Sequence, residues 1–231
     1  MREEIIKQLG IVSFTAEERF QSRRNEVYKM RARTQSGGEL YFVYKKYTCG
    51  DVGTEYAALN ALKYLRVPVV LDKGEDSLDL TYIEGPTMLS VLEESEAGGT
   101  PSEPFTEEFI CFLESFYTAL PGQVYGDINF RNFIFSNGKL FGVDFEEVRA
   151  GEKEEDIGRA AAFLLTYAPA FTEYKKEAAA GLIRYAAGRL RLDSSCILQA
   201  AEKELLNMGQ RRGKSIPGDV FYAEFVKKYQ L

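Results

Sequence analysis

The sequence predicts an α+β fold in which a small antiparallel sheet precedes a mainly helical region. Strand-like runs rich in aromatic and β-branched residues occupy 26–32 and 40–47, early in the chain. From residue 106 onwards, apolar residues recur three and four positions apart, which is the spacing of amphipathic helices. Asn137-Gly138 adds a hairpin signal, because both residues accept the positive φ of a type I′ turn.

Residues 1–20 are expected to form a helix with a break. A first apolar group has helical spacing: Ile5, Ile6 and Leu9. Thr15 then offers an N-cap before an acidic first turn, which predicts a second helical segment. The runs 26–32 and 40–47 are expected to pair as a hairpin, because Ser36-Gly37-Gly38 supplies turn residues between them.

From Thr54 the apolar spacing becomes helical, and this helix is expected to stop near Pro68. Its apolar stripe consists of Tyr56, Leu59, Leu62 and Leu65. Two short strands are predicted next, over 69–71 and 78–82, because a polar, glycine-containing segment separates two apolar runs. From residue 26 to residue 82, the predicted order of elements is therefore strand, strand, helix, strand, strand.

The rest of the chain is expected to be helical around one hairpin. Thr106 is the predicted cap of a helix that continues to about Leu120. Runs on either side of Asn137-Gly138 are apolar and β-prone, so they form the hairpin. Further helices are predicted over 156–167, 173–190 and 194–207.

The composition is that of an ordinary soluble globular protein, with 45% hydrophobic and 28% charged residues among 231. No long uncharged apolar run and no signal-peptide core is evident, so a cytoplasmic location without membrane attachment is expected. Three cysteines far apart, without a Cys-x-x-Cys pair, are expected to be reduced thiols. The net charge of −6 argues against a broad nucleic-acid surface, so no nucleic-acid partner is expected.

Three polar residues surround the predicted hairpin. Asn132 enters its first strand, Asp144 leaves its second strand, and Asp127 lies on the loop just before. We expect the side chains of Asn132 and Asp144 to emerge on the same side of this two-stranded ribbon. Their oxygens are hard ligands that suit Mg²⁺, and Asp127 would orient an attacking hydroxyl. The set therefore predicts phosphoryl transfer, whereas a hydrolase using only the paired carboxylates leaves Asn132 unexplained.

This ordered set resembles the motifs of the kinase-like phosphotransferases, which include aminoglycoside phosphotransferases, choline and other small-molecule kinases, and RIO-type kinases. Those families typically read His-Gly-Asp-x-x-x-x-Asn and then Asp-Phe-Glu. Gly126-Asp127, Asn132 and Asp144-Phe145-Glu146 match this pattern. Tyr125 departs from it, because it occupies the position where His is usual. The chain contains no histidine at all. That His has an architectural role in the family, and Tyr is a hydrogen-bonding substitute for it.

The resemblance implies a two-lobed protein-kinase-like fold, with a small antiparallel-sheet N-lobe and a mainly helical C-lobe. Residues 1–85 would form the N-lobe, with an N-terminal helix, the antiparallel sheet and one further helix. Residues 86–231 would form the C-lobe, with the catalytic loop and hairpin over 124–147. Asp156 resembles the aspartate that braces the catalytic loop at the start of a helix in small-molecule kinases.

The resemblance also implies a strand lysine that pairs the ATP phosphates and a helix glutamate that holds it. Val43-Tyr44-Lys45-Lys46 is similar to the Val-Ala-Ile-Lys of kinases. Because side chains alternate along a strand, Val43 and Lys45 share one face, which favours Lys45, with Lys46 as the alternative. Glu55, early in the following helix, is the expected partner, a role compatible with stabilising the helix dipole.

Two further segments would bind the nucleotide. The loop from Ser22 to Asn25 lacks Gly-x-Gly-x-x-Gly, but it precedes an Asn-x-Val-Tyr run similar to that of aminoglycoside phosphotransferases. Its backbone amides would approach the phosphates, assisted by Arg23 or Arg24. The segment 80–85 resembles the family's hinge. Backbone groups of Thr81 and Ile83 would bond adenine there.

The expected function is ATP- and Mg²⁺-dependent transfer of the γ-phosphate to a hydroxyl of a small molecule. Eleven residues separate Asp144 from Asp156, too few for the activation segment with which protein kinases dock a peptide. A RIO-like protein kinase and a catalytically silent nucleotide-binding scaffold are the alternatives. Glu146 is either a further metal ligand or a solvent-facing carboxylate. The acceptor is not specified by any motif, and residues 170–231 are expected to help bind it.

Overall fold

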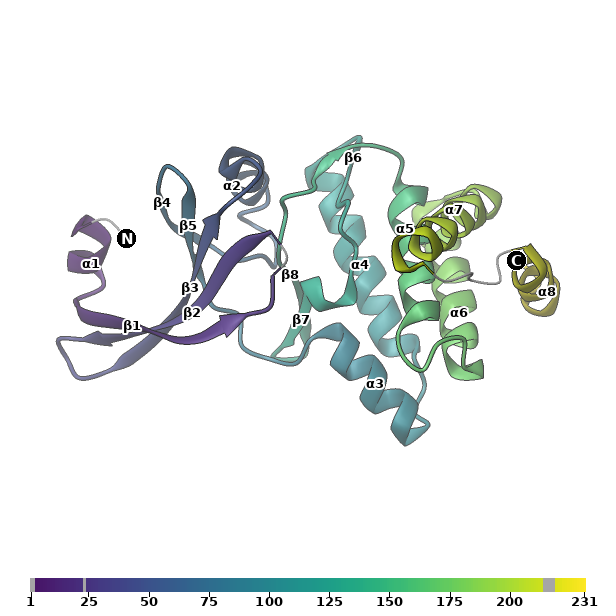
Figure 1. The fold of residues 1–231 in the computed structure, drawn as a ribbon, viewed down its shortest axis with the longest axis horizontal. Helices are drawn as coiled ribbons and strands as arrows, with labels where there is room; N and C mark the ends of the chain where they lie inside the picture. The colour runs from purple at the N-terminus through teal and green to yellow at the C-terminus, as the bar shows by residue number, and fades with distance from the viewer. Residues whose placement is uncertain (1–2, 23, 214–218) are drawn as a thin grey trace. The chain divides into compact units, whose positions relative to one another are not determined.

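A computed structural model describes residues 3–22, 24–213 and 219–231 of the chain. The described chain divides into two compact units (Figure 1). Unit 1 consists of residues Met1–Glu84 together with Phe141–Val148. Unit 2 consists of Gly85–Leu140 and Arg149–Leu231. The segment Phe141–Val148 therefore clusters with unit 1, although residues of unit 2 precede and follow it in the sequence.

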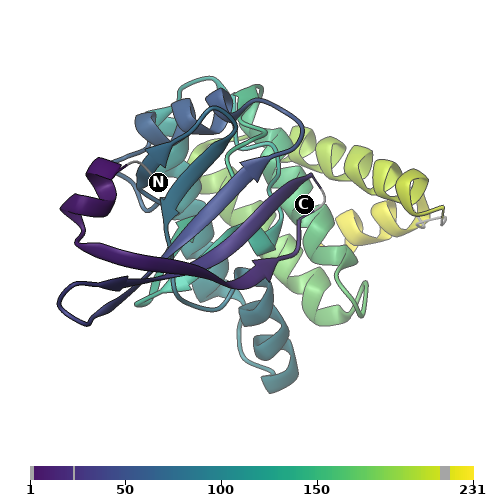
Figure 2. The same ribbon diagram turned by 60° about the vertical axis from the view of Figure 1, so that its left-hand side comes forward.

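Unit 1 is built on a five-stranded antiparallel sheet in the order β1-β2-β3-β5-β4 (Figure 2). Its elements are α1 (Glu3–Gln8), β1 (Ile11–Phe20), β2 (Asn25–Thr34), β3 (Glu39–Tyr47), α2 (Val52–Ala61), β4 (Val70–Lys73) and β5 (Ser77–Thr81). The predicted hairpin of β2 and β3 is confirmed, with Tyr28 opposite Tyr44 and Val27 opposite Lys45. The two later strands, β4 and β5, are also confirmed.

The helix expected after Thr15 is wrong. Residues Ile11–Phe20 form the edge strand β1, which pairs with β2 so that Phe14 lies opposite Ala32. The Phe14 ring packs edge-on against Phe42, at 6.0 Å between ring centroids. Backbone pairing with β2 and this apolar contact outweigh the local helix signal, because helical propensity is a weak preference that tertiary contacts override.

The two faces of β3 serve different purposes. Phe42 belongs to an apolar cluster with Ile11 and Ala32, and Tyr44 packs against this cluster from the same face. Lys45 and Tyr47 lie on the opposite face and are also buried, 5% and 7% exposed. Helix α2, which begins at Val52 because the Asp51 side chain caps the N–H of Gly53, carries Glu55 to this second face.

Unit 2 is mainly helical, which confirms the predicted α+β class. Its elements are α3 (Met88–Gly98), α4 (Glu103–Ala119), β6 (Gln123–Val124), the 3₁₀ turn η1 (Phe130–Asn132), β7 (Phe133–Ser136), β9 (Arg149–Ala150), α5 (Lys153–Thr166), α6 (Glu173–Leu190), α7 (Ser194–Arg212) and α8 (Asp219–Tyr229). Strand β7 pairs with β8 (Lys139–Gly142), and the φ values of Asn137 (50°) and Gly138 (72°) confirm the predicted turn.

Helices α4 and α3 of unit 2 depart from the sequence prediction. Helix α4 begins at Glu103, with Pro104 in its first turn, and Thr106 lies inside the helix instead of capping it. The Thr106 hydroxyl donates to the carbonyl of Ser102, so its side chain satisfies a backbone acceptor one turn earlier. Helix α3 was not predicted. Its N-cap is Thr87, whose hydroxyl accepts a hydrogen bond from the N–H of Ser90.

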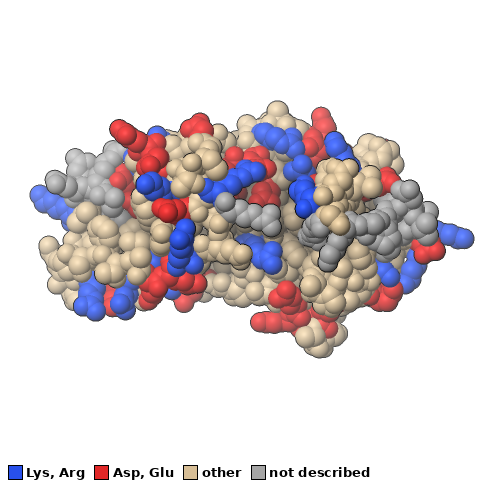
Figure 3. Space-filling view, in the orientation of Figure 1, with Lys and Arg blue, Asp and Glu red and all other residues tan. Residues whose placement is uncertain are grey.

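Acidic and basic side chains are mixed on the face of the molecule drawn in Figure 3. On the face seen in Figure 3, red and blue groups alternate, and neither sign forms a broad patch among the described residues. Within the part of the chain that the structure describes, none of the helices combines the length and apolar character needed to cross a membrane.

Candidate active site

Lys45 and Glu55 form a buried ion pair in unit 1. The Nζ of Lys45 lies 2.7 Å from Oε2 of Glu55, and the two residues are only 5% and 1% exposed. Strand alternation directs Lys45 away from the Phe42 face, and the first turns of α2 place Glu55 opposite it. The neighbouring Lys46 is half-exposed and lies 4.0 Å from Asp76. Of the two strand lysines, Lys45 is thus the one held beside Glu55.

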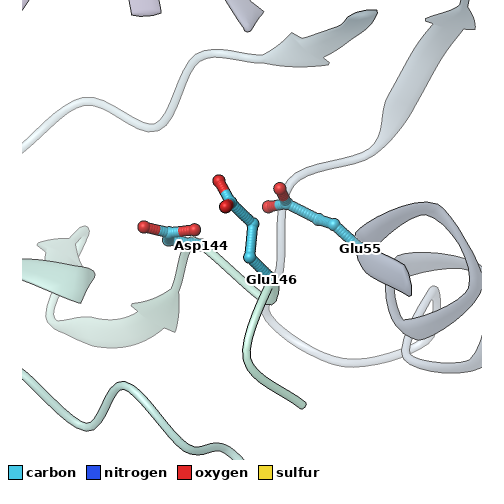
Figure 4. A group of neighbouring side chains, drawn as sticks. All are labelled: Glu55, Asp144 and Glu146. Carbon is cyan, nitrogen blue, oxygen red and sulfur yellow. The ribbon is translucent and has the colours of Figure 1, made fainter. Parts of the chain in front are cut away.

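The Asp-Phe-Glu segment contributes two more carboxylates to Lys45. The Nζ atom lies 2.8 Å from Oδ1 of Asp144 and 2.6 Å from Oε1 of Glu146. The backbone N–H of Phe145 donates to Oε1 of Glu55 at 3.1 Å, which ties the segment to α2. Figure 4 shows the three carboxylates turned toward a common space, and their oxygens lie within 4.8 Å of one another.

The backbone at Asp144 has a left-handed conformation, with φ of 68°. Such values are uncommon outside glycine, although Asp and Asn tolerate them better than other residues. Here the conformation accompanies a carboxylate that bonds Lys45, next to a residue whose N–H bonds Glu55. Local strain of this kind concentrates at functional sites, where surrounding contacts hold it in place.

The charges in this cluster determine its protonation. Burial by itself would lower the pKa of Lys45, but the negative charges of Glu55, Asp144 and Glu146 outweigh it and hold the pKa above its ordinary value of 10.5. Burial also raises the pKa of Glu146, against the opposing effect of Lys45. Lys45 is therefore a cation at neutral pH, which is the form that binds phosphate oxygens.

Sequence reasoning missed Tyr47, which completes the cluster. Its hydroxyl donates a hydrogen bond to Oε2 of Glu55, the oxygen that also faces Lys45. Burial, followed by the charge of Glu55, raises the pKa of Tyr47, so the hydroxyl keeps its proton. Its position could have been predicted from the spacing, because a residue two positions after Lys45 lies on the same face of the strand.

The predicted phosphate loop lies against the same segment. Asn25 donates from its side-chain amide to Oε1 of Glu146, and its backbone N–H donates to the Ser22 hydroxyl at 3.1 Å. Arg24 forms an ion pair with Glu147 at 2.7 Å. Arg23 lies outside the described residues. A small pocket of about 180 Å³ adjoins this loop and is lined by Arg24, Cys49, Gly50, Asp51 and Glu146.

The two predicted hinge residues, Thr81 and Ile83, differ in their surroundings. The N–H of Thr81, at the end of β5, donates to the carbonyl of Val69 at 2.9 Å, and the Thr81 hydroxyl accepts from the N–H of Val69. The N–H of Thr81 is thus used within unit 1. Ile83 follows in the loop after β5 and is half-buried. Their expected contacts with adenine stay predictions.

The predicted catalytic loop lies in unit 2, where Asp127 and Asn132 are in contact. The side-chain amide of Asn132, at the end of η1, donates to the carbonyl of Asp127 at 3.0 Å and to its Oδ2 at 3.1 Å. Asn129 caps η1 by accepting from the N–H of Arg131. Because the amide nitrogen of Asn132 faces Asp127, its amide oxygen points away from Asp127.

Asp156 holds the start of this loop, as the resemblance to small-molecule kinases implied. Its carboxylate accepts hydrogen bonds from the backbone N–H groups of Tyr125 (2.7 Å) and Gly126 (3.1 Å) and from the hydroxyl of Tyr117 (3.0 Å). Burial raises the pKa of Asp156, although all three donors lower it. Gly126 has φ of 85°, which glycine adopts without strain, and this turn leads directly into Asp127.

Tyr125 is fully buried in an aromatic cluster of unit 2. Its ring lies 5.1 Å from that of Phe133 and 5.5 Å from that of Phe116, between ring centroids. Tyr125 thus fills core space directly before the predicted catalytic loop. Asp156 holds Tyr125 through its backbone N–H. A His at this position would offer the same N–H, so the anchor of the loop does not depend on the side chain.

Each unit therefore assembles part of the predicted site. Unit 1 brings Lys45, Glu55 and Asp144 together, and unit 2 brings Asp127 and Asn132 together. Asn132 and Asp144 belong to different units, so their joint use as metal ligands stays a prediction.

Comparison with known proteins identifies the type of fold. No protein-family model and no curated protein sequence matches the chain. The chain is similar in structure to an ethanolamine kinase of Plasmodium vivax, with a TM-score of 0.56 and 8% identity over 100% of this chain and 85% of that one. A choline kinase of Cryptosporidium parvum matches with a TM-score of 0.55 and 8% identity over 98% and 93%. The chain thus has a two-lobed kinase-like α+β fold, and at this identity the likeness is one of fold.

Proposed function

We propose that this protein is an ATP- and Mg²⁺-dependent phosphotransferase that acts on a hydroxyl of a small molecule. The observation that carries the proposal is the buried pair of Lys45 and Glu55 with Asp144 bound to the same ammonium. A cation of this kind, held by carboxylates, is the arrangement with which kinases position phosphates. The structural likeness to ethanolamine and choline kinases supports the same reaction class.

The donor set suits magnesium. Asp144 and Glu146 offer carboxylate oxygens, and Asn132 offers an amide oxygen, which are the hard ligands that Mg²⁺ prefers. Bound Mg²⁺ would neutralise charge on the phosphate oxygens. Asp144 and Asn132 are the proposed ligands. Glu146 now bonds Lys45, so it would have to release the ammonium before it could take part.

The remaining roles follow from the residues. Lys45 would bind phosphate oxygens with its ammonium, and Glu55 would hold it in place. Backbone groups near Ser22 and Asn25 would approach the phosphates, and the backbone of Thr81 and Ile83 would bond adenine. Asp127 would accept the proton of the acceptor hydroxyl and orient its oxygen toward the phosphorus. Asn132, which donates to Asp127 Oδ2, would keep that carboxylate oriented.

The acceptor is proposed to be a small hydroxylated molecule, with ethanolamine and choline as the first compounds to test. The chain from Asp144 to Asp156 is too short for a peptide-docking segment, which makes a RIO-like protein kinase the weaker proposal. A catalytically silent scaffold is the competing function, and Tyr125 with the glycine-poor loop are the observations that favour it.

The test is phosphoryl transfer by the purified full chain, followed by ³¹P NMR with ATP, Mg²⁺ and a panel of amino alcohols, sugars and aminoglycosides. Asp127→Asn is expected to lower kcat by about 10²-fold or more, while ATP affinity by calorimetry changes little. Asp76→Asn, in the exposed loop between β4 and β5, is the matched control and should retain activity. If the wild type binds ATP but transfers nothing, and Tyr125→His restores no activity, the scaffold is correct.

A further inference from the structure

Tyr47 lies on the same face of β3 as Lys45, two residues further along the strand. Its side chain is buried, and its ring centroid lies 5.3 Å from the Nζ of Lys45. Its hydroxyl donates to Oε2 of Glu55. The residue therefore contacts both members of the buried pair, through its ring and through its hydroxyl.

The carboxylate of Glu55 receives three hydrogen bonds. Oε2 accepts from Tyr47 and from Lys45, and Oε1 accepts from the N–H of Phe145 at 3.1 Å. A carboxylate that is 1% exposed needs such donors, because burial of an unpaired charge is costly. Tyr47 and Phe145 are neutral donors from two different segments, so together they restrict the orientation of the Glu55 carboxylate.

The third donor, Lys45, is shared. Its ammonium contacts Asp144 and Glu146 as well as Glu55. An incoming phosphate would compete for the same ammonium protons, since an ammonium has three of them. Any shift of Lys45 toward phosphate weakens its hold on Oε2 of Glu55. The Tyr47 hydroxyl would still occupy that oxygen, so the carboxylate would keep its orientation.

We propose that Tyr47 is a positioning residue that fixes the Glu55 carboxylate, and through it the Lys45 ammonium, so that the ammonium stabilises the charge that develops on the phosphate oxygens during transfer. This inference rests on the proposed function. A purely structural role would require only the ring, which fills space beside Lys45. The hydroxyl is the part that acts on Glu55, and it is the part that a Tyr47→Phe variant removes.

The matched control is Tyr44→Phe. Tyr44 is on the same strand, but it packs against the Ile11, Ala32 and Phe42 cluster on the opposite face. The full-length wild type, both variants, Glu55→Gln and the double variant Tyr47→Phe/Glu55→Gln would be compared for kcat and for the KM of ATP. Tyr47→Phe is expected to lower kcat about tenfold, because the lost bond is to a buried charge, and to change the KM of ATP less than about twofold. Tyr44→Phe should change neither value by more than about twofold.

The double variant separates positioning from packing. If Tyr47 acts through Glu55, adding Tyr47→Phe to Glu55→Gln should cost much less than it costs the wild type. Equal losses in both backgrounds would overturn the inference in favour of a structural role. Wild-type kcat in Tyr47→Phe would overturn it as well, while leaving the proposed function intact.

A second measurement needs no nucleotide. In urea unfolding, the wild type, Tyr47→Phe, Glu55→Gln and the double variant should show energetic coupling between Tyr47 and Glu55, seen as a smaller effect of Tyr47→Phe in the Glu55→Gln background. Absence of coupling would overturn the hydrogen bond on which the inference depends. Coupling in a wild type that neither binds nor turns over ATP would instead overturn the proposed function, and the phosphate-positioning role of Tyr47 with it.

Discussion

Asp156, in the first turn of α5, accepts a hydrogen bond at 2.7 Å from the backbone N–H of Tyr125, 31 residues earlier in the chain. The same carboxylate also accepts from Gly126 and from the Tyr117 hydroxyl. It is fully buried, so the turn that leads into Asp127 depends on an acceptor that water cannot replace. The turn that begins the predicted catalytic loop is thus held by a side chain outside the loop.

Asp156→Asn should destabilise the fold. The amide would present an NH₂ group to at least one of three donors, leaving a buried donor unsatisfied, at a cost of about 2–3 kcal/mol in the free energy of unfolding. Urea unfolding would measure it. Asp193→Asn is the matched control, because Asp193 is the exposed N-cap of α7 and Asn caps helices about as well as Asp. Equal stability of the two variants would show that Asp156 does not brace the loop.

Tyr125→His should also reduce stability, by about 2 kcal/mol or more, because a smaller polar ring would replace one packed between Phe116 and Phe133. Thermal unfolding would measure the effect. The result bears on activity as well, since any gain of phosphoryl transfer in Tyr125→His must be assayed at a temperature where the variant is folded. An unchanged unfolding temperature would contradict the role of Tyr125 in the core.

Lys45→Met and Lys46→Met should differ in nucleotide binding. Lys45 is buried beside Glu55, whereas Lys46 is half-exposed near Asp76. We expect ATP affinity to fall about tenfold or more in Lys45→Met and less than about twofold in Lys46→Met, because only one ammonium is held among the carboxylates. Calorimetry would measure the ATP affinity of both variants, after circular dichroism has verified that each is folded. Equal or reversed effects would place the phosphates on the other face of β3.

Asp144→Asn should weaken metal-dependent nucleotide binding. The amide keeps one oxygen but loses the charge, so ATP affinity in the presence of Mg²⁺ is expected to fall about tenfold. Without metal the affinity should stay equal or rise, because a negative charge near the phosphates is removed. Calorimetry with Mg²⁺ and with a chelator measures both, and Asp76→Asn is the control. Nucleotide binding indifferent to both metal and substitution would rule out Asp144 as a ligand.

Several elements could be predicted from local sequence because their causes are local. The hairpin of β7 and β8 follows from two residues that accept positive φ, and the φ values at Asn137 and Gly138 agree. Helix α6 spans Glu173–Leu190, as its apolar spacing and its Thr172 cap require. The brace by Asp156 has no local cause, since its backbone partners lie about 30 residues earlier, and it was implied only by the resemblance to small-molecule kinases.

Other features depend on partners far away in the sequence. Residues after Thr15 carry a helix signal, yet they form β1 because β2 offers a pairing edge and Phe42 an apolar contact. The contacts of Tyr47 and Asn25 were not foreseen, since Glu55 and Glu146 reach them only after the chain has folded back.

The sequence by itself determined which chemical groups the protein has and the order in which they occur: a strand lysine, a helix glutamate, Asp127, Asn132 and Asp144. The tertiary structure decided which of these groups form hydrogen bonds or ion pairs with one another. Lys45 bonds three carboxylates from two segments, Glu55 takes its second donor from Tyr47, and Asn132 turns its amide toward Asp127. Spacing along the chain can place a residue on a face of a strand or helix, but hydrogen bonding also requires the partner's distance and direction, which depend on how the whole unit packs.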